Sequence, residues 1–261
     1  MIESHSKEPP VLNPAYGDGQ FVRAMAIRQK GPRHYILGVE DSVHAFWIEF
    51  HHDDKILTQA KGQWLRAPFT SCTGAPEALQ ALQGTALTQD LRTLKGLADS
   101  NLQCTHLFDA LRLGLIHAAH QRADRRYDVI VPDQSQGIAH VRLLVDGQEV
   151  MAIDIRKPDM ILEGPAAYAG RPILRGFGTW ATALLDAEQF EKFFMLQRAL
   201  FVSSARQIDM PHYYNRPATD SGPPMNSCFG AQEARYRAAI RQANTMMHSM
   251  TPDMLLHFLH P

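Results

Sequence analysis

Residues 138–155, IAHVRLLVDGQEVMAIDI, contain two runs rich in branched apolar residues on either side of Asp146-Gly147. An Asp-Gly pair is typical of the central positions of a tight hairpin turn. Strands joined by so short a turn run antiparallel, since a parallel pair needs a much longer crossover. This stretch therefore predicts an antiparallel hairpin.

The first quarter of the chain predicts more strands of the same kind. Its segments are rich in β-branched and aromatic residues and are separated by short turns, which favours an antiparallel meander. The segments are GQFVRAMAIRQKG (19–31), RHYILGV (33–39), VHAFWIEF (43–50) and KILTQAKGQWL (55–65). Apolar residues at helical spacing mark 75–87, 100–122 and 187–201. This order of strands and helices predicts an α+β fold, with a mainly antiparallel sheet and long amphipathic helices packed on it.

The two ends of the chain differ in composition from the part between them. Residues 1–19 are polar and contain prolines, which predicts a flexible tail, and residues 20–208 carry the patterns of a single α+β domain. Residues 209–261 predict a proline-rich loop and then a C-terminal helix, roughly 230–250, packed on the same domain. We therefore expect one continuous folded unit.

Composition excludes several classes of function. The chain has 26 Lys and Arg against 27 Asp and Glu, with no basic run, so we expect no nucleic-acid partner. No apolar run approaches the roughly 20 residues that span a membrane, and the N-terminus lacks the pattern of a signal peptide. These features predict a cytoplasmic protein without a membrane partner. Neither a G-x-G-x-x-G nor a Walker-type motif is present, and we expect no cofactor.

The helix predicted at 100–122 carries the residues of greatest chemical interest. Its SNLQ segment has the form of a capping box, which predicts a helix start near Ser100 and places His106 in the second turn. The positive end of a helix keeps an imidazole neutral, so His106 is either a general base or an exposed surface residue. Cys104 is either a thiolate nucleophile favoured by the same dipole or a buried thiol.

Two motifs could suggest a metal. His117 and His120 have H-x-x-H spacing, but the helical wheel places both on the solvent face, away from the apolar stripe. The sequence HHDD at 51–54 falls between two predicted strands, where a solvated turn explains it. No further ligand is evident near either motif, and we predict no metal site.

His44 and Arg66 raise questions of a different kind. His44 shares a strand face with Phe46 and Ile48, so its imidazole needs a hydrogen-bond partner, for which Asp41 is a candidate, or a ligand. Arg66 is followed by Ala-Pro-Phe, and its cation is either a surface strand end or a clamp for an anion or phenolate.

Several blocks resemble a bacterial family that is catalogued as a domain of unknown function. The blocks are D-x-x-H at 41–44, R-A-P-x-x-x-C at 66–72 and C-T-H-L-F-D at 104–109, and the resemblance spans roughly 20–210. It implies that the family's motif positions here are His44, Arg66, Cys72, Cys104, Thr105 and His106. Some members of this family occur beside pathways of aromatic degradation, and the chain resembles cofactor-independent lyases that release formaldehyde from lignin-derived dimers.

The resemblance leads to our first hypothesis, a lyase that acts by acid-base chemistry on a hydrophobic phenolic small molecule. His106 or His44 would be the base and Arg66 the cationic clamp. The substrate would be bound by Tyr35, Trp47, Trp64, Phe69, Cys72, Cys104 and Thr105.

Two alternatives remain open. One is a non-catalytic module that binds a small molecule or forms a homodimer through an aromatic-rich surface. The other is a metal-dependent hydrolase that uses Cys104, His106 and other imidazoles.

Overall fold

The predicted Asp-Gly hairpin joins β6 (Gly137–Val145) to β7 (Gln148–Lys157). Its turn residues Asp146 and Gly147 have φ angles of 51° and 81°. Both angles are positive, as the tightest hairpin turn requires, and this is why an Asp-Gly pair occupies the turn. The prediction drawn from residues 138–155 is confirmed.

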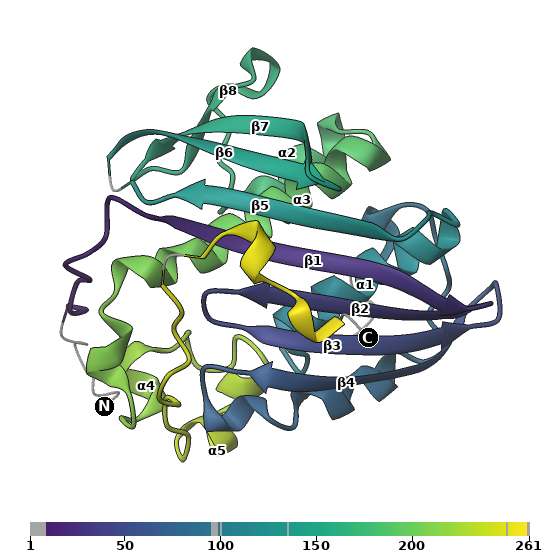
Figure 1. The fold of residues 1–261 in the computed structure, drawn as a ribbon, viewed down its shortest axis with the longest axis horizontal. Helices are drawn as coiled ribbons and strands as arrows, with labels where there is room; N and C mark the ends of the chain where they lie inside the picture. The colour runs from purple at the N-terminus through teal and green to yellow at the C-terminus, as the bar shows by residue number, and fades with distance from the viewer. Residues whose placement is uncertain (1–8, 95–98, 100, 135, 249, 260–261) are drawn as a thin grey trace.

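The computed structural model describes residues 9–94, 99, 101–134, 136–248 and 250–259. Within these residues, eight strands form one antiparallel sheet in the order β4-β3-β2-β1-β5-β6-β7-β8 (Figure 1). The other six strands are β1 (Gln20–Gly31), β2 (His34–Asp41), β3 (Ala45–His52), β4 (Leu57–Arg66), β5 (Arg125–Pro132) and β8 (Ile161–Gly164). The predicted α+β class with a mainly antiparallel sheet is confirmed.

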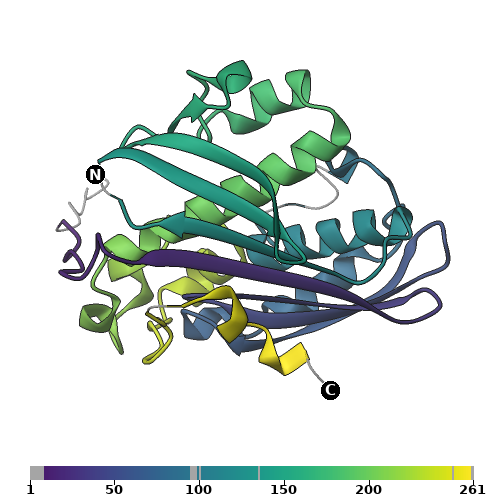
Figure 2. The ribbon, with the colours of Figure 1, turned by 45° about the horizontal axis from the view of Figure 1, so that its top comes forward.

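The helices lie mainly on one face of this sheet. The α-helices are α1 (Thr105–Ala119), α2 (Phe177–Leu184), α3 (Ala187–Ser203), α4 (Ala218–Ser221) and α5 (Glu233–Tyr236). Short 3-10 helices span Thr70–Cys72, Ala75–Leu82, Leu91–Leu94, Ala166–Tyr168, Ser204–Gln207, Met210–Tyr213, Phe229–Ala231, Pro252–Met254 and His257–Leu259. Figures 1 and 2 show α1 and α3 behind the sheet and the C-terminal segment crossing its other face.

Strand β1 carries apolar residues on both faces of the sheet. Phe21 and Ile27 are buried in the main core beneath the helices, whereas Val22 and Ala24 are buried in a smaller cluster with the C-terminal Leu255. Alternate residues of a strand point to opposite faces, so a strand covered on both sides needs apolar residues at both parities. The C-terminal segment is thus part of the covering of the sheet.

The predicted C-terminal helix at 230–250 is wrong. Among the described residues of that span only α5 is α-helical, and after it Ile240 forms an isolated bridge with Pro217 and Arg241 one with Phe69. Backbone pairing with distant segments has replaced the helical hydrogen bonds that the local pattern favoured. Residues 1–8 of the predicted flexible tail lie outside the described residues, while Asn13 donates its backbone N–H to Gln207 O.

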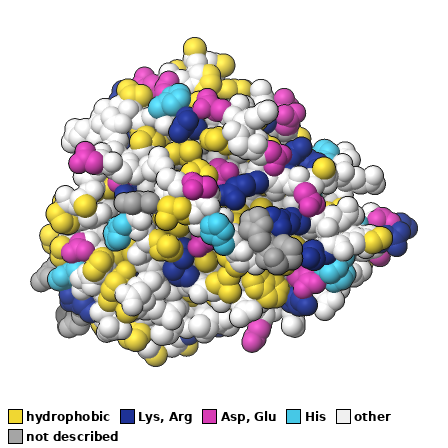
Figure 3. Space-filling model, viewed as in Figure 1, with side chains coloured by type: hydrophobic (Ala, Val, Ile, Leu, Met, Phe, Trp, Pro, Cys, Tyr) yellow, Lys and Arg dark blue, Asp and Glu magenta, His cyan; other side chains and the backbone are white. Residues whose placement is uncertain are grey.

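Charged side chains of both signs are interspersed over the face drawn in Figure 3. This distribution agrees with the formal net charge of −1. In the described part of the chain, no helix is both long and apolar enough to cross a membrane.

Candidate functional site

The turn between β2 and β3 holds an aspartate and a histidine in a fixed geometry. Asp41 Oδ1 accepts hydrogen bonds from the backbone N–H groups of Val43 and His44, each at 2.8 Å. The same oxygen lies 3.1 Å from Nδ1 of the His44 ring. Both side chains are buried. An aspartate that closes its own turn is a common local motif, and here it also positions the imidazole three residues later.

The electrostatics of this turn keep Asp41 ionised. Burial by itself would raise its pKa, but the charges of His44 and Arg23 and the hydrogen bonds it accepts outweigh burial, so the pKa lies well below the ordinary value. An ionised carboxylate can only accept, so Nδ1 of His44 must donate to it. In neutral His44 the lone pair available for proton transfer is therefore on Nε2.

Arg66 contributes to the same turn from the end of β4. Its Nη2 donates to the backbone oxygens of Asp41 and His44, at 2.5 and 3.3 Å, and its Nη1 donates to Glu40 Oε1 at 3.2 Å. The hypothesis that Arg66 clamps an anion or phenolate finds no support in this position, because its fork is occupied by the protein and it does not line the cavity described below. Arg66 holds the turn in place.

His106 lies against His44 from the first turn of α1. The two ring centroids are 4.1 Å apart, with 44° between the ring planes. Burial lowers the pKa of His106 well below its ordinary value, and repulsion from His44 and Arg23 adds to this effect. His106 is therefore neutral at neutral pH, as expected from the sequence, although burial is the larger cause.

The start of α1 differs from the prediction. The helix begins at Thr105 with Cys104 as its N-cap, so the predicted start near Ser100 is wrong, and Ser100 itself lies outside the described residues. Gln103 forms long-range contacts in place of a helical turn, since its side chain donates to Ala78 O and its backbone oxygen accepts from Phe229 N. His106 is consequently one turn closer to the helix end than predicted.

A cavity of about 280 Å³ opens beside the two histidines. Seven residues proposed from the sequence line it: His44, Trp64, Phe69, Cys72, Cys104, Thr105 and His106. The rest of the lining comes mainly from α3 and the residues after it, including Phe201, Met210, Tyr236 and Arg241. An aromatic and aliphatic wall with a few polar groups is typical of small-molecule sites.

The three cysteines, although far apart in sequence, all line this cavity. Burial raises the pKa of Cys72 to about 12 and raises that of Cys104 further. Both thiols are therefore protonated at neutral pH, and a thiolate nucleophile at Cys104 is disfavoured. Their contribution to the cavity is apolar surface.

Tyr35 and Trp47 lie away from this cavity, contrary to the expectation that they form its walls. Tyr35 stacks on Phe50 and His52, and Trp47 packs with the cluster beneath the C-terminal segment. The physical reason is strand geometry. Tyr35 lies at the end of β2 that is far from His44. Trp47 alternates with Phe46 and Ile48 along β3, so its side chain points to the opposite face of the sheet. The sequence indicated their aromatic character but not their position.

Some residues of the site were missed. Asp41, which holds His44 but does not line the cavity, was considered only as a hydrogen-bond partner. Tyr236 and Arg241, which do line it, were assigned to the incorrectly predicted C-terminal helix. The D-x-x-H spacing was the available signal for Asp41. No local signal exists for Arg241, because the chain brings it to Phe69 from a position more than 150 residues away.

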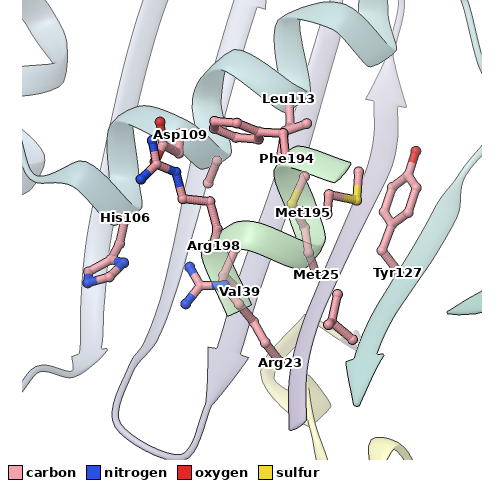
Figure 4. Close-up of a pocket in the computed structure, with 12 residues that line it drawn as sticks. Arg23, Met25, Val39, His106, Asp109, Leu113, Tyr127, Phe194, Met195 and Arg198 are labelled. Atoms are coloured by element: carbon pink, nitrogen blue, oxygen red, sulfur yellow. The ribbon is translucent and has the colours of Figure 1, made fainter. Parts of the chain in front are cut away.

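A second, smaller cavity of about 40 Å³ lies on the inner side of His106. Figure 4 shows Asp109 of α1 meeting Arg198 of α3 near His106, with Arg23 of β1 across the space. Arg198 Nε lies 2.7 Å from Asp109 Oδ2. This volume has room for a few water molecules among charged groups. His106 therefore lies between the larger cavity and a small one whose mainly apolar wall also carries Arg23, Asp109 and Arg198.

The residues that could hold a metal lie elsewhere. Among the described residues, the group of three potential ligands with mutually close atoms is His34, Glu49 and His51. The two imidazoles are stacked, 4.1 Å apart and only 17° from parallel, and Lys61 Nζ lies 2.8 Å from Glu49. Because a metal binds in the plane of an imidazole, two nearly parallel rings are poorly arranged to share one ion. Thus HHDD contributes one residue to this group.

The prediction that His117 faces solvent is wrong, whereas His120 is exposed as expected. His117 is 1% exposed and contacts the edge of Tyr35. The helix is covered on more of its circumference than its apolar stripe implied, because Leu91 and neighbouring residues pack over it. H-x-x-H on this helix is therefore not a surface pair.

The sequence was also compared with known proteins and families. No curated protein matches the chain significantly. A family model described as "Protein of unknown function (DUF2889)" matches residues 20–121, a segment that includes His44, Cys72, Cys104 and His106 but not Arg241. Residues 20–121 are thus similar to the DUF2889 domain, to which no function is assigned.

Proposed function

We propose that the 280 Å³ cavity is the active site of a lyase that uses acid-base chemistry, without a redox cofactor, on a hydrophobic phenolic small molecule. The observation that carries this proposal is the Asp41–His44 pair at the wall of an aromatic-lined cavity, beside the neutral His106. A histidine whose tautomer is set by a buried carboxylate is a recurrent form of general base.

Release of formaldehyde from a side chain ending in CH2OH illustrates the chemistry. His44 Nε2 takes the hydroxyl proton, the O–H electron pair becomes the second C–O bond of formaldehyde, and the adjoining C–C bond breaks. The pair from that bond forms an alkene as an oxygen leaving group departs from the benzylic carbon. The proton held by His44 returns to this departing oxygen, so atoms and charge balance. Asp41 stabilises the imidazolium that exists between the two transfers.

The surroundings suit this sequence of steps. Trp64 and Phe69 offer flat apolar walls for aromatic rings, and the ring of Trp64 lies 5.9 Å from that of His44. The buried indole Nε1 of Trp64 has no hydrogen-bond partner within the described residues, so a substrate oxygen could accept from it. Protonated Cys72 and Cys104 do not compete as bases.

The test is a formaldehyde assay on purified protein with a panel of lignin-type aromatic dimers that carry a hydroxymethyl group. We expect turnover by the wild type and a loss of about 100-fold or more in His44→Ala. His120→Ala is the matched control, because His120 is exposed at the other end of α1, and it should retain full activity. Absence of turnover across the panel, or undiminished turnover in His44→Ala, would reject the proposal.

A further inference from the structure

Arg241 is a buried cation in the wall of the cavity. It is 3% exposed, and its guanidinium carbon lies 4.5 Å from the centroid of the Phe69 ring. Nε donates to Ser221 Oγ at 2.8 Å and Nη2 donates to Ser221 O at 3.3 Å. Neutral oxygens and an aromatic face hold this side chain in position, but none of them balances its charge.

The other buried arginines have carboxylate partners. Arg206 is held by Asp133 through two hydrogen bonds, of 2.7 and 2.6 Å, and Arg112 pairs with Asp109 at 3.2 Å. Within the described residues, no carboxylate forms an ion pair with Arg241. The fold therefore compensates two of these three cations and leaves the one in the cavity unpaired.

The titratable groups around Arg241 do not supply a negative charge. Burial raises the pKa of Tyr236 to about 12, as it does for Cys72, and both groups are neutral at neutral pH. Burial lowers the pKa of Arg241 itself, yet a guanidinium retains its proton at neutral pH. An unpaired buried charge is costly, so such a group is a candidate for binding an anion.

We propose that Arg241 binds the carboxylate of an aromatic carboxylic acid in this cavity. The inference rests on the proposed function to the extent that it takes this cavity as the substrate site. A carboxylate fits better than a phenolate, since it is ionised at neutral pH and can accept from Nη1 of Arg241, which donates to no group among the described residues, as well as from the second hydrogen of Nη2. The aromatic part of the same molecule would lie along Phe69 and Trp64, toward His44.

The first experiment uses the wild-type protein only. Benzoate, cinnamate and stilbene-4-carboxylate are titrated by calorimetry at pH 7.5, each beside its primary amide of nearly equal shape. We expect at least one acid to bind about tenfold or more tightly than its amide, the difference expected of a charge-assisted contact. Equal binding of acids and amides, or binding of neither, would overturn the inference.

The second experiment compares two buried arginines. Arg241→Met should reduce the affinity for the preferred acid about tenfold or more, with little effect on the amide. It should also leave the unfolding temperature of the ligand-free protein unchanged or higher, because an uncompensated charge is removed. Arg206→Met should lower that temperature, since it leaves Asp133 buried and unpaired. An Arg241→Met protein that is destabilised like Arg206→Met and binds the acid normally would assign Arg241 a structural role.

These outcomes are separable from those of the lyase proposal. Stilbene-4-carboxylate has no hydroxymethyl group, so its binding needs no turnover. Acid binding that depends on Arg241 but not on His44, in a protein that releases no formaldehyde, would reject the lyase and keep the anion site. Formaldehyde release together with equal binding of acids and amides would keep the lyase and reject the anion site.

Discussion

The two ends of helix α1 bring histidines against the same strands in different ways. At its N-terminal end, His106 meets His44, whose ring is held by Asp41 and faces a cavity. At its C-terminal end, His117 meets Tyr35, which in turn stacks on His52. The residue types are similar, but Asp41 lies against the ring of His44, whereas no carboxylate among the described residues hydrogen-bonds the ring of His117.

The comparison shows that the hydrogen-bond partners of a histidine ring, and not the types of residue around it, distinguish a potentially reactive histidine from one that only packs. Neither ring nitrogen of His117 has a hydrogen-bond partner among the described residues, and burial lowers its pKa to about 4. Such a ring fills space and remains neutral. His44 instead has one nitrogen fixed by Asp41, which both orients the ring and stabilises its charged form.

The largest expected difference between the two ends is in catalysis. If formaldehyde release is established, His44→Gln should lower kcat by about 10²- to 10⁴-fold, because glutamine cannot take up a proton. His117→Gln should change kcat by less than about twofold from the wild-type value, because His117 takes no part in the proton transfer. Initial rates under saturating substrate provide the measurement. Comparable losses in both variants would mean that the two ends do not differ in function.

The next effect is on stability and concerns the carboxylates. Asp41→Asn should lower the free energy of unfolding by about 3 kcal/mol, because the fully buried Asp41 would no longer pair with Arg23, whose side chain is only 12% exposed. Asp54→Asn is the matched change at the other end, where the pair with Arg33 is exposed, and it should cost less than about 1 kcal/mol. Urea unfolding at pH 7 measures both. A small loss in Asp41→Asn would contradict a tightly coupled turn.

A smaller effect is the pH dependence contributed by the packed end. Below about pH 6.5 the unfolded chain protonates His117, whereas the folded chain does so only near pH 4. Stability from this group is thus complete above pH 6.5 and falls as the pH decreases toward 4, by about 2 kcal/mol between pH 6.5 and 5. His117→Leu should remove that part of the slope in unfolding measured at pH 7, 6 and 5. An unchanged slope would show that His117 is not the responsible group.

The smallest effect is expected for the thiol of Cys104, at the N-terminal end of α1. Because burial raises the pKa of Cys104, its thiol is not a nucleophile at neutral pH, and Cys104→Ala should change the rate of formaldehyde release by less than about threefold. Modification by iodoacetamide at pH 7.5 should likewise be slow. A rate loss comparable with that of His44→Gln would transfer the chemistry from the imidazole to the sulfur.

Much of the fold followed from local patterns in the sequence. Segments rich in β-branched and aromatic residues, separated by short turns, predicted the antiparallel sheet. Asp146-Gly147 predicted its hairpin, because that turn depends on two adjacent residues only. The blocks around His44, Cys72 and His106 also pointed to residues that meet at one cavity. The strands and the hairpin depend on interactions between residues that are close in sequence. The cavity residues were indicated by the blocks that resemble the family.

Other features depended on contacts between distant segments. The start of α1, the burial of His117 and the irregular C-terminal segment all differ from the local pattern because tertiary hydrogen bonds and packing outweigh helix propensity. Arg241 could not be placed from the sequence, since its role depends on which carboxylates are absent around it. The sequence alone therefore determined the strands and the chemical groups, while only the tertiary structure decided which groups face one another and which charge is left unpaired.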